Sequence, residues 1–165
     1  MWDIASPDLP AALAVPFGLV ENAFRRLSRH VQGMSQSELE FTGEGVNSTA
    51  MLLAHLAFVD MEYLHCIKGV SVPADLEAEY GPVETESGTL PVVTGLSAAQ
   101  LLERYRRVID MIRAYLQSQT DADAVRPVQI PWWPEPATVR YVLWHMAAHS
   151  MHHQGQIVRL KAEVR

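Results

Sequence analysis

The chain has a single cysteine, Cys66, among its 165 residues. One cysteine cannot form a disulfide within the chain, which fits a reducing compartment. The N-terminus has no basic stretch followed by an apolar segment, so we expect no secretory signal peptide. The apolar runs are broken within about ten residues, which is too short to span a membrane. We therefore predict a cytoplasmic protein with no membrane partner.

Positive charge is scarce as well. The sequence holds 13 lysines and arginines against 19 aspartates and glutamates, which gives a formal net charge of −6. A protein that binds the nucleic-acid backbone needs a basic face, so this composition argues against a nucleic-acid partner. Hydrophobic residues make up 48% of the chain, enough to build one core at this length. We predict a single domain over residues 1–165.

Strict alternation of apolar and polar residues is missing, and so are internal repeats and low-complexity segments. Helical spacing is common instead. An apolar stripe from Leu13 to Val31 indicates the first helix. Pro16 and Gly18 weaken its first turns, so the helix is expected to begin after them. Residues 32–47 follow as a predicted loop.

The second helix is expected to begin at a cap formed by Asn47 or Ser48 and to run to about Lys68, where Gly69 stops it. The segment 70–96 that follows is acidic and rich in proline and glycine. A connection of this length is uncommon inside a compact domain. It is long enough to cross the bundle, so helices 2 and 3 need not be antiparallel neighbours.

Ser97 and Gln100 form a capping box at the start of a third helix, which is expected to reach about Gln119. Another predicted loop follows, with a short extended piece at Val128–Ile130. Thr138 then caps a fourth helix that extends nearly to the end of the chain. These elements predict an all-α fold: a four-helix bundle with a long connection between helices 2 and 3.

Four histidines lie close together near the C-terminus, at positions 145, 149, 152 and 153. His149 and His153 share one face of the expected helix, at a spacing that suits two ligands of one metal ion. His145 and His149 have the same spacing, so spacing alone leaves the pair open. The apolar stripe favours His149 and His153, because His145 lies at its edge. His152 points away from it. The stripe consists of Val142, Met146, His149, His153, Ile157 and Leu160.

A further histidine, His55, lies in the apolar stretch of the second helix. Three neutral imidazoles from two helices are what a divalent metal ion with open coordination positions needs. We therefore predict a metal site of His55, His149 and His153. Cys66 lies about 16 Å beyond His55 along the helix, so it cannot bind the same ion. Glu62, about 10 Å from His55, could orient a water molecule or line a pocket.

Other conspicuous residues are given structural roles. Trp132 and Trp133 are expected to plug the end of the bundle, with a pocket lid as the alternative. Gly155 is expected to let a neighbouring helix approach closely. The remaining histidines are expected at the surface or beside the site: His30, His65, His145 and His152. The methionines are expected to fill the core: Met34, Met51, Met61, Met111, Met146 and Met151.

Two segments, NSTAMLLAHLAFVDMEYL in the second helix and VLWHMAAHSMHHQGQIVRL in the fourth, resemble the DinB/YfiT-like superfamily of four-helix-bundle metalloproteins. The specific features are a histidine in helix 2 and an H-x-x-x-H-x-G-Q block in helix 4. Here these residues are His55, His149, His153, Gly155 and Gln156. In general layout the likeness extends over nearly the whole chain.

The resemblance implies a divalent metal ion, nickel or zinc, on the three histidines, with water completing its shell. It also implies a homodimer and an enzyme that uses a low-molecular-weight thiol such as mycothiol or bacillithiol. Two positions depart from the pattern, since Ser150 stands where glutamate is common and Gln154 where arginine is frequent. Neither departure removes a ligand. The residues expected around the ligands are Glu62, His145, His152 and Gln156.

We hypothesise a metal-dependent thiol S-transferase that acts on a small-molecule substrate. A metal-dependent hydrolase that uses metal-bound hydroxide is the alternative among enzymes, and it needs no thiol. A non-catalytic, stress-response metal-binding bundle is the third hypothesis. It predicts a metal ion with no exchangeable water and no adjoining cavity, and a fourth protein ligand, His145 or His152, would support it. Three ligands leave open positions on the ion, which favours an enzyme.

Overall fold

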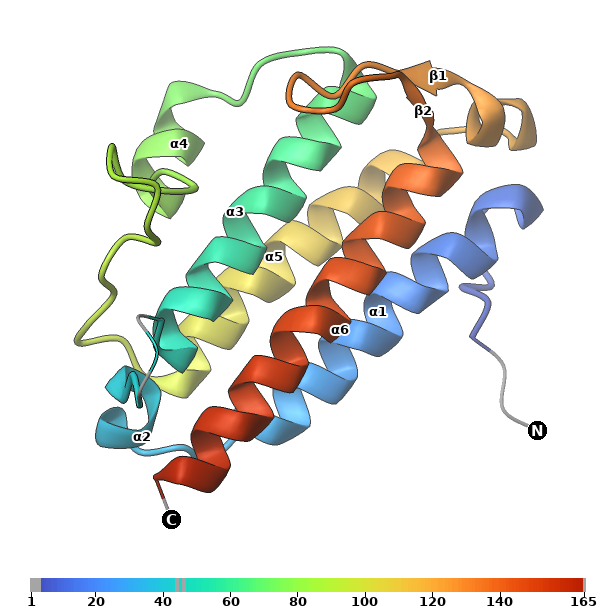
Figure 1. The fold of residues 1–165 in the computed structure, drawn as a ribbon. Coiled ribbons are helices and arrows are strands. Elements are labelled where there is room, and N and C mark those ends of the chain that lie inside the picture. The colour runs from blue at the N-terminus through green and yellow to red at the C-terminus, as the bar shows by residue number, and fades with distance from the viewer. Residues whose placement is uncertain (1–3, 44, 46, 165) are drawn as a thin grey trace.

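The computed structural model describes residues 4–43, 45 and 47–164. The two ends of the predicted domain, residues 1–3 and 165, lie outside that range. Four long helices pack into one bundle, which confirms the predicted all-α four-helix architecture (Figure 1). The four helices are α1 (Ala11–Val31), α3 (Thr49–Lys68), α5 (Ala98–Gln117) and α6 (Val139–Glu163).

The four helices form a closed square in which each contacts two neighbours, in the order α1, α6, α3 and α5. Helices α1 and α6 run in one direction, whereas α3 and α5 run in the other (Figure 1). Neighbours α3 and α5 are therefore parallel, and the segment 70–96 must cross the length of the bundle between them. Helices α3 and α6 lie side by side and antiparallel, so residues from their middles face one another.

Helix α1 begins at Ala11, before Pro16 rather than after it, which corrects the sequence-based start. Tertiary contacts stabilise the early turns: the backbone N–H of Ala12 donates to the Asp121 carboxylate at 2.9 Å, and the side chains of Leu13 and Phe17 are buried. Gly18 sits against the Ile4 carbonyl, where a Cβ atom would overlap it. Glycine is needed there because the N-terminal segment packs directly on the helix.

The predicted ends of α3 and the start of α5 are confirmed. The Ser48 hydroxyl caps α3 by accepting from the Met51 N–H, and Gly69 ends the helix with φ of +70°. Ser97 and Gln100 form the predicted capping box of α5. Helix α6 begins after Thr138, as predicted, although the Thr138 side chain makes no capping hydrogen bond.

Two short helices occupy segments that the sequence reasoning left as connections. Helix α2 (Gln36–Glu40) interrupts the predicted loop 32–47, and Ser35 with Glu38 forms its capping box. This serine–glutamate spacing was a signal that the sequence offered. Helix α4 (Ala74–Tyr80) lies within the long connection between α3 and α5.

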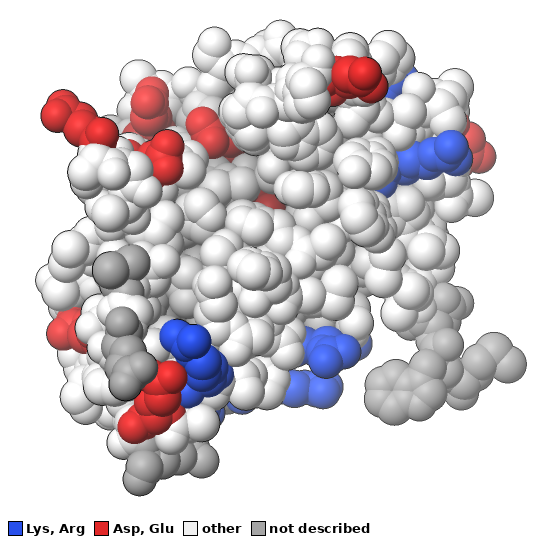
Figure 2. Space-filling view, in the orientation of Figure 1, with Lys and Arg blue, Asp and Glu red and all other residues white. Residues whose placement is uncertain are grey.

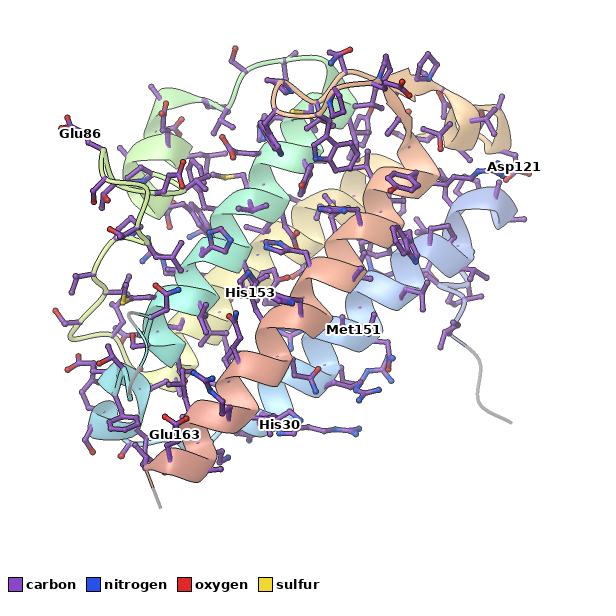
Figure 3. The ribbon with its side chains drawn as sticks, in the orientation of Figure 1. His30, Glu86, Asp121, Met151, His153 and Glu163 are labelled. Carbon is purple, nitrogen blue, oxygen red and sulfur yellow. The ribbon has the colours of Figure 1, made fainter. Side chains whose placement is uncertain are left out.

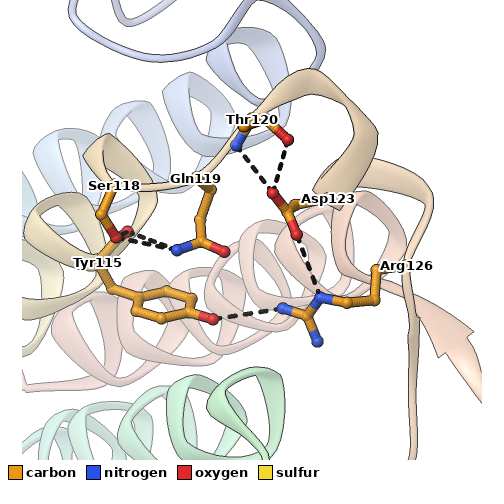
Figure 4. Close-up of polar contacts among 6 residues, drawn as sticks. All are labelled: Tyr115, Ser118, Gln119, Thr120, Asp123 and Arg126. Atoms are coloured by element: carbon orange, nitrogen blue, oxygen red, sulfur yellow. Dashed lines mark hydrogen bonds and ion pairs between the residues drawn. The ribbon is translucent and has the colours of Figure 1, made fainter.

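The connection from α5 to α6 is fixed by polar contacts. It contains the 3-10 helix η1 (Asp121–Val125) and a two-stranded antiparallel sheet, β1 (Pro127–Val128) with β2 (Ala137–Thr138). The Asp123 carboxylate accepts from the N–H and hydroxyl of Thr120 at 2.9 and 2.8 Å and contacts Arg126 (Figure 4). This sheet joins the two ends of the segment 129–136, which carries Trp132 and Trp133.

Helix α3 is the most deeply embedded helix of the bundle. By length and composition it could cross a membrane, contrary to the expectation that the apolar runs are too short, but 78% of its apolar window is buried inside the fold. Such burial is typical of the core helix of a bundle. Most of the methionines fill the core as predicted, but Met151 is 47% exposed on α6 (Figure 3).

Candidate metal centre

Three histidine side chains meet between α3 and α6. The Nε2 atom of His149 lies 3.3 Å from Nε2 of His55 and 2.9 Å from Nε2 of His153. One ligand nitrogen from each histidine falls within 4.8 Å of the other two. His153 comes from the middle of α6, on its side toward α3 (Figure 3). The structure thus brings together the three residues that the spacing argument selected.

The donor set fits a divalent metal ion. Nitrogens bound to one tetrahedral zinc ion at about 2.0–2.1 Å lie about 3.3 Å apart, close to the separations in this cluster. The three converging ring nitrogens cannot all be paired by hydrogen bonds among themselves, because each neutral imidazole has only one N–H donor. The buried Nδ1 atom of His149 also has no hydrogen-bond partner among the described residues.

Burial keeps these imidazoles neutral. Loss of solvent, together with smaller contributions from the neighbouring His153 and His55, lowers the pKa of His149 to about 3. Burial likewise lowers the pKa of His153 to about 4, although its hydrogen bond to Gln156 opposes the shift. The pKa of His55 is lowered by burial too. Near neutral pH all three rings therefore hold an unprotonated nitrogen, the form that binds metal.

Gln156 orients one of the three rings. Its Oε1 atom lies 2.8 Å from Nδ1 of His153. The amide oxygen can only accept, so this contact places the ring proton on Nδ1 and leaves the Nε2 lone pair facing the cluster. The Nε2 atom of His152 lies 3.3 Å from the Gln156 amide nitrogen. His152 is exposed and stays outside the cluster.

His145 lies beside the cluster without joining it. Its ring is stacked on His149 with 6.2 Å between centroids, and it packs edge-on against Trp133 at 4.8 Å. Among the described residues, one group of three or more possible ligands comes together, and it contains neither His145 nor His152. Cys66 is also absent from this group, as its distance along the helix predicted.

A cavity of about 480 Å³ opens beside the histidines, and His55 and His149 form part of its wall. Glu62 lines it, in agreement with the sequence reasoning. Trp132 lines it too, so the prediction that both tryptophans plug the bundle end is wrong for Trp132. The sequence reasoning missed several wall residues, although the paired tryptophans marked their segment as unusual. The other wall residues are Val59, Tyr63, Val83 and Glu84.

The sequence placed the two α6 ligands within the apolar stripe of the helix. The structure places them at the edge of the buried face instead. His149 and His153 are half-buried at its edge, while Ser150 and Gln154 occupy buried positions. This edge position exposes the ring nitrogens to the cavity. Gly155 is exposed with nothing packed against it, so the expected close helix approach does not occur there.

The most buried polar network near the cluster was not predicted. The Tyr105 hydroxyl donates to the Asp60 carboxylate at 2.6 Å and lies 2.6 Å from the Ser150 hydroxyl. Burial raises the pKa of Asp60 to about 7, against the lowering effect of the Tyr105 hydrogen bond. These three side chains come from α3, α5 and α6, so the network ties three helices together.

His65 corrects another expectation. It was placed at the surface or beside the site, but the ring is buried and its Nδ1 lies 2.8 Å from the Met61 carbonyl oxygen. The carbonyl oxygen can only accept, so Nδ1 carries the proton. His65 is thus a buried core histidine whose Nδ1–H donates to a carbonyl oxygen of its own helix, as is common for a single histidine on an apolar face.

Fold and site together define a DinB/YfiT-like four-helix bundle with a three-histidine candidate metal centre. Comparison with known families agrees, since the model of the mycothiol-S-transferase family matches residues 15–165. The chain belongs to this family. It is also 33% identical over 159 residues to YkkA, an uncharacterized protein of Bacillus subtilis (strain 168), covering 94% of this chain and 90% of the relative.

Solved structures support the same fold. YfiT from Bacillus subtilis, described as a probable metal-dependent hydrolase with an unusual four-helix bundle topology, is 20% identical with a TM-score of 0.67, covering 90% of this chain and 85% of YfiT. A conserved protein from Enterococcus faecalis is 18% identical with a TM-score of 0.70 (91% and 95% covered). A DinB-like protein from Bacillus cereus is 16% identical with a TM-score of 0.63 (89% and 91% covered).

Proposed function

We propose that this protein is a divalent-metal-dependent S-transferase that joins a low-molecular-weight thiol to an electrophilic small molecule. The observation that carries the proposal is the trio His55, His149 and His153, whose ring nitrogens converge beside a cavity large enough for a small substrate. Membership of the mycothiol-S-transferase family supports the choice of a thiol substrate.

The three histidines would hold the ion, nickel or zinc. When bound, such an ion acts as a Lewis acid and lowers the pKa of a thiol or water that reaches it. The protein supplies the remaining conditions. Burial keeps His149 and His153 unprotonated, and Gln156 fixes the tautomer of His153. Tyr63 and Trp132 supply an aromatic part of the cavity wall.

The proposed reaction balances without a redox partner. The thiol sulfur forms a bond to an electrophilic carbon of the second substrate. The bond between that carbon and its leaving group breaks, and the leaving group departs with the electron pair. The thiol proton passes to solvent through the open cavity. Cys66, the one cysteine of the chain, is not the nucleophile of this step, since it does not belong to the histidine cluster.

The test is a conjugation assay on protein stripped of metal and reloaded with nickel or zinc. Mycothiol or bacillithiol is mixed with 1-chloro-2,4-dinitrobenzene, and the conjugate is followed by its absorbance. We expect metal-loaded protein to accelerate conjugation, and His149→Ala to abolish the acceleration while His152→Ala retains it. The transferase would be refuted if protein with one ion bound per chain did not accelerate conjugation with any of a series of electrophiles.

A metal-dependent hydrolase is the second candidate, favoured by the description of the structural neighbour YfiT. Activity in thiol-free buffer separates it from the transferase. A fourth protein ligand would support a non-catalytic metal-binding bundle, but its two candidates, His145 and His152, both lie outside the group of three. The homodimer stays a prediction that size measurement in solution will test.

A further inference from the structure

A second cavity, of about 450 Å³, lies along the same two helices as the first. Leu52 lines it from α3, one helical turn before His55, and α6 lines it with residues on both sides of Gly155. Thr42, Gly45 and Asn47, which precede α3, complete its wall. Because α3 and α6 are antiparallel, the two cavities follow one another along this helix pair, with the histidine cluster between them (Figure 1).

Gln156 connects the second cavity to the candidate metal centre. Its side chain lines the cavity, and its Oε1 atom accepts from Nδ1 of His153 at 2.8 Å. His152 lines the cavity as well, with its Nε2 atom 3.3 Å from the amide nitrogen of Gln156. A ligand in this cavity is therefore separated from a metal-binding histidine by a single side chain.

Side chains that form hydrogen bonds make up much of the wall of the second cavity. They are Thr42, Asn47, His152, Gln156 and Arg159. The buried Oδ1 atom of Asn47 has no hydrogen-bond partner among the described residues. A buried acceptor without a donor is unfavourable, and a ligand that supplies the donor removes that cost. The wall is thus suited to a ligand that forms several hydrogen bonds.

The second cavity is polar without being strongly charged. Arg159 is its one arginine, and the Nε atom of Arg159 lies 3.3 Å from the Glu163 carboxylate. Figure 2 shows acidic and basic side chains together near the C-terminal end of α6, whereas the acidic side chains over α4 have no basic neighbour in view. Donors and acceptors on several sides, with the charge of the arginine compensated, favour a ligand with many hydroxyl groups over an ion.

Gly155 keeps part of this cavity open. It lies inside α6, where glycine weakens a helix relative to alanine, and its backbone has no positive φ that would require glycine. A Cβ atom at this position would meet nothing within 4 Å, so no neighbouring helix requires glycine there either. The absence of a side chain instead leaves space in the cavity that Gly155 lines.

We infer that the second cavity binds the polyhydroxylated sugar part of the thiol, while the electrophile occupies the first cavity beside Trp132. The inference rests on the proposed function in taking as substrate a thiol such as mycothiol or bacillithiol, both of which carry a sugar. The sulfur of a thiol held in this way is directed toward His153, and its sugar hydroxyls lie among Asn47, Gln156 and Arg159. The two substrates then reach the histidines from opposite sides.

Binding to metal-free protein tests this assignment without catalysis. The two probes are S-methylmycothiol and N-acetyl-S-methylcysteine amide, which have the same capped sulfur with and without the sugar. By titration calorimetry we expect the sugar-bearing probe to bind at least about tenfold more tightly. In Gly155→Leu the ratio should fall below about threefold, because the leucine side chain fills the cavity. Equal affinities for the parent, or binding of neither probe, would overturn the inference.

The matched control is Ala162→Leu, which adds the same side chain at another exposed position of α6 that lines neither cavity. It should keep the ratio of the parent. A second variant, Asn47→Leu, replaces the amide with an apolar side chain of similar size and should also lower the ratio, by at least about threefold. A preference for the sugar-bearing probe that survives in both Gly155→Leu and Asn47→Leu would place the sugar elsewhere and contradict the inference.

The conjugation assay on metal-loaded protein separates the two cavities. Gly155→Leu should raise the KM for mycothiol at least about tenfold and leave the KM for 1-chloro-2,4-dinitrobenzene within about twofold of the parent. An equal rise in both values would contradict separate cavities for the two substrates.

Failure of the proposed function and failure of this inference give different results. If the metal-loaded parent does not accelerate conjugation but the metal-free protein prefers the sugar-bearing probe, the transferase is refuted and the sugar site stands. If conjugation is accelerated but the parent binds the two probes equally, the transferase stands and the sugar site is refuted.

Discussion

Two polar clusters lie between α3 and α6, and they differ in how their hydrogen bonds are satisfied. In the network of Asp60, Tyr105 and Ser150 a donor faces each acceptor contact, and all three side chains are buried. In the cluster of His55, His149 and His153 three nitrogens of the same kind face one another beside a cavity. The first cluster forms matched donor–acceptor contacts within the chain, although Asp60 Oδ1 has no hydrogen-bond partner among the described residues, whereas the second brings together nitrogens that suit a partner from outside.

The comparison shows that burial alone does not mark a functional site. Both clusters are desolvated, and burial shifts the pKa of Asp60 upward and those of His149 and His153 downward, so each group is driven toward its neutral form. Neutral Asp60 can share protons with Tyr105. Neutral imidazoles instead direct lone pairs at one point, and that arrangement suits a metal ion.

The largest expected effect is a loss of metal affinity when the histidine cluster is changed. His149→Ala should weaken zinc or nickel binding by on the order of 1000-fold or more, because two ligands cannot replace three. The unfolding free energy of the metal-free protein should change little, since the buried Nδ1 of His149 has no partner to lose. Competition titration with a chelator measures the first quantity. Full metal affinity in the variant would show that the ion is held elsewhere.

A change in the Asp60 network should lower the stability of the protein and leave its metal affinity unchanged. Asp60→Ala should lower the unfolding free energy by about 3 kcal/mol, since it leaves the buried Tyr105 hydroxyl without its acceptor and opens a void. Metal affinity should stay within about threefold of the parent, because the network is not part of the histidine cluster. Urea unfolding of metal-free protein gives the stability. Unaltered stability would mean that the network contributes nothing.

A smaller effect is expected from the residue that orients a ligand. Gln156→Leu should reduce metal affinity by about 10–100-fold, as is usual when a ligand histidine loses its hydrogen-bond partner. Gln156→Glu keeps an acceptor at the same position and should restore most of that affinity. If Leu and Glu behave alike, the contact between Gln156 and Nδ1 of His153 has no part in metal binding.

The last effect is graded with pH, and it amounts to at most about a tenfold change in the folding constant for each pH unit. Folding raises the pKa of Asp60 to about 7, so its contribution to stability is complete below about pH 4 and is lost as the pH rises through 7. His149 and His153 act with opposite sign, because their lowered pKa values add stability above about pH 6.5 that is lost in acid. Comparing the parent with Asp60→Asn isolates the aspartate.

In that comparison, raising the pH from 4 to 7 should shift relative stability toward Asp60→Asn, by up to about tenfold in the folding constant per pH unit. The measurement is urea unfolding of both metal-free proteins across this range. Parallel stability curves for the two proteins would show that Asp60 titrates in the fold as it does in the unfolded chain.

The histidine trio could be predicted because its information is local. A spacing of four residues on one helix and an isolated histidine on another are visible in the sequence, and the bundle brings them together. The cavity walls could not be predicted in the same way. Val83 and Glu84 follow a helix that was not expected, and Trp132 reaches the site through a segment fixed by Asp123 and Arg126.

The Asp60 network escaped prediction for a related reason. An aspartate in an apolar run gives no hint of its partner, because Tyr105 lies 45 residues away on α5 and Ser150 lies on α6. The helix ends, by contrast, followed local rules: Ser48, Gly69 and Ser97 each act within one helical turn. What the sequence misses are contacts that depend on the packing of three helices.

The central claim is that His55, His149 and His153 hold one divalent ion with positions left open for substrate. X-ray absorption spectroscopy, combined with elemental analysis of untagged protein reloaded with zinc, tests it most directly. The account predicts one ion per chain, three imidazole nitrogens at about 2.0–2.1 Å and at least one exchangeable oxygen. Absence of stoichiometric zinc or nickel, or an ion enclosed by four protein ligands, would contradict it.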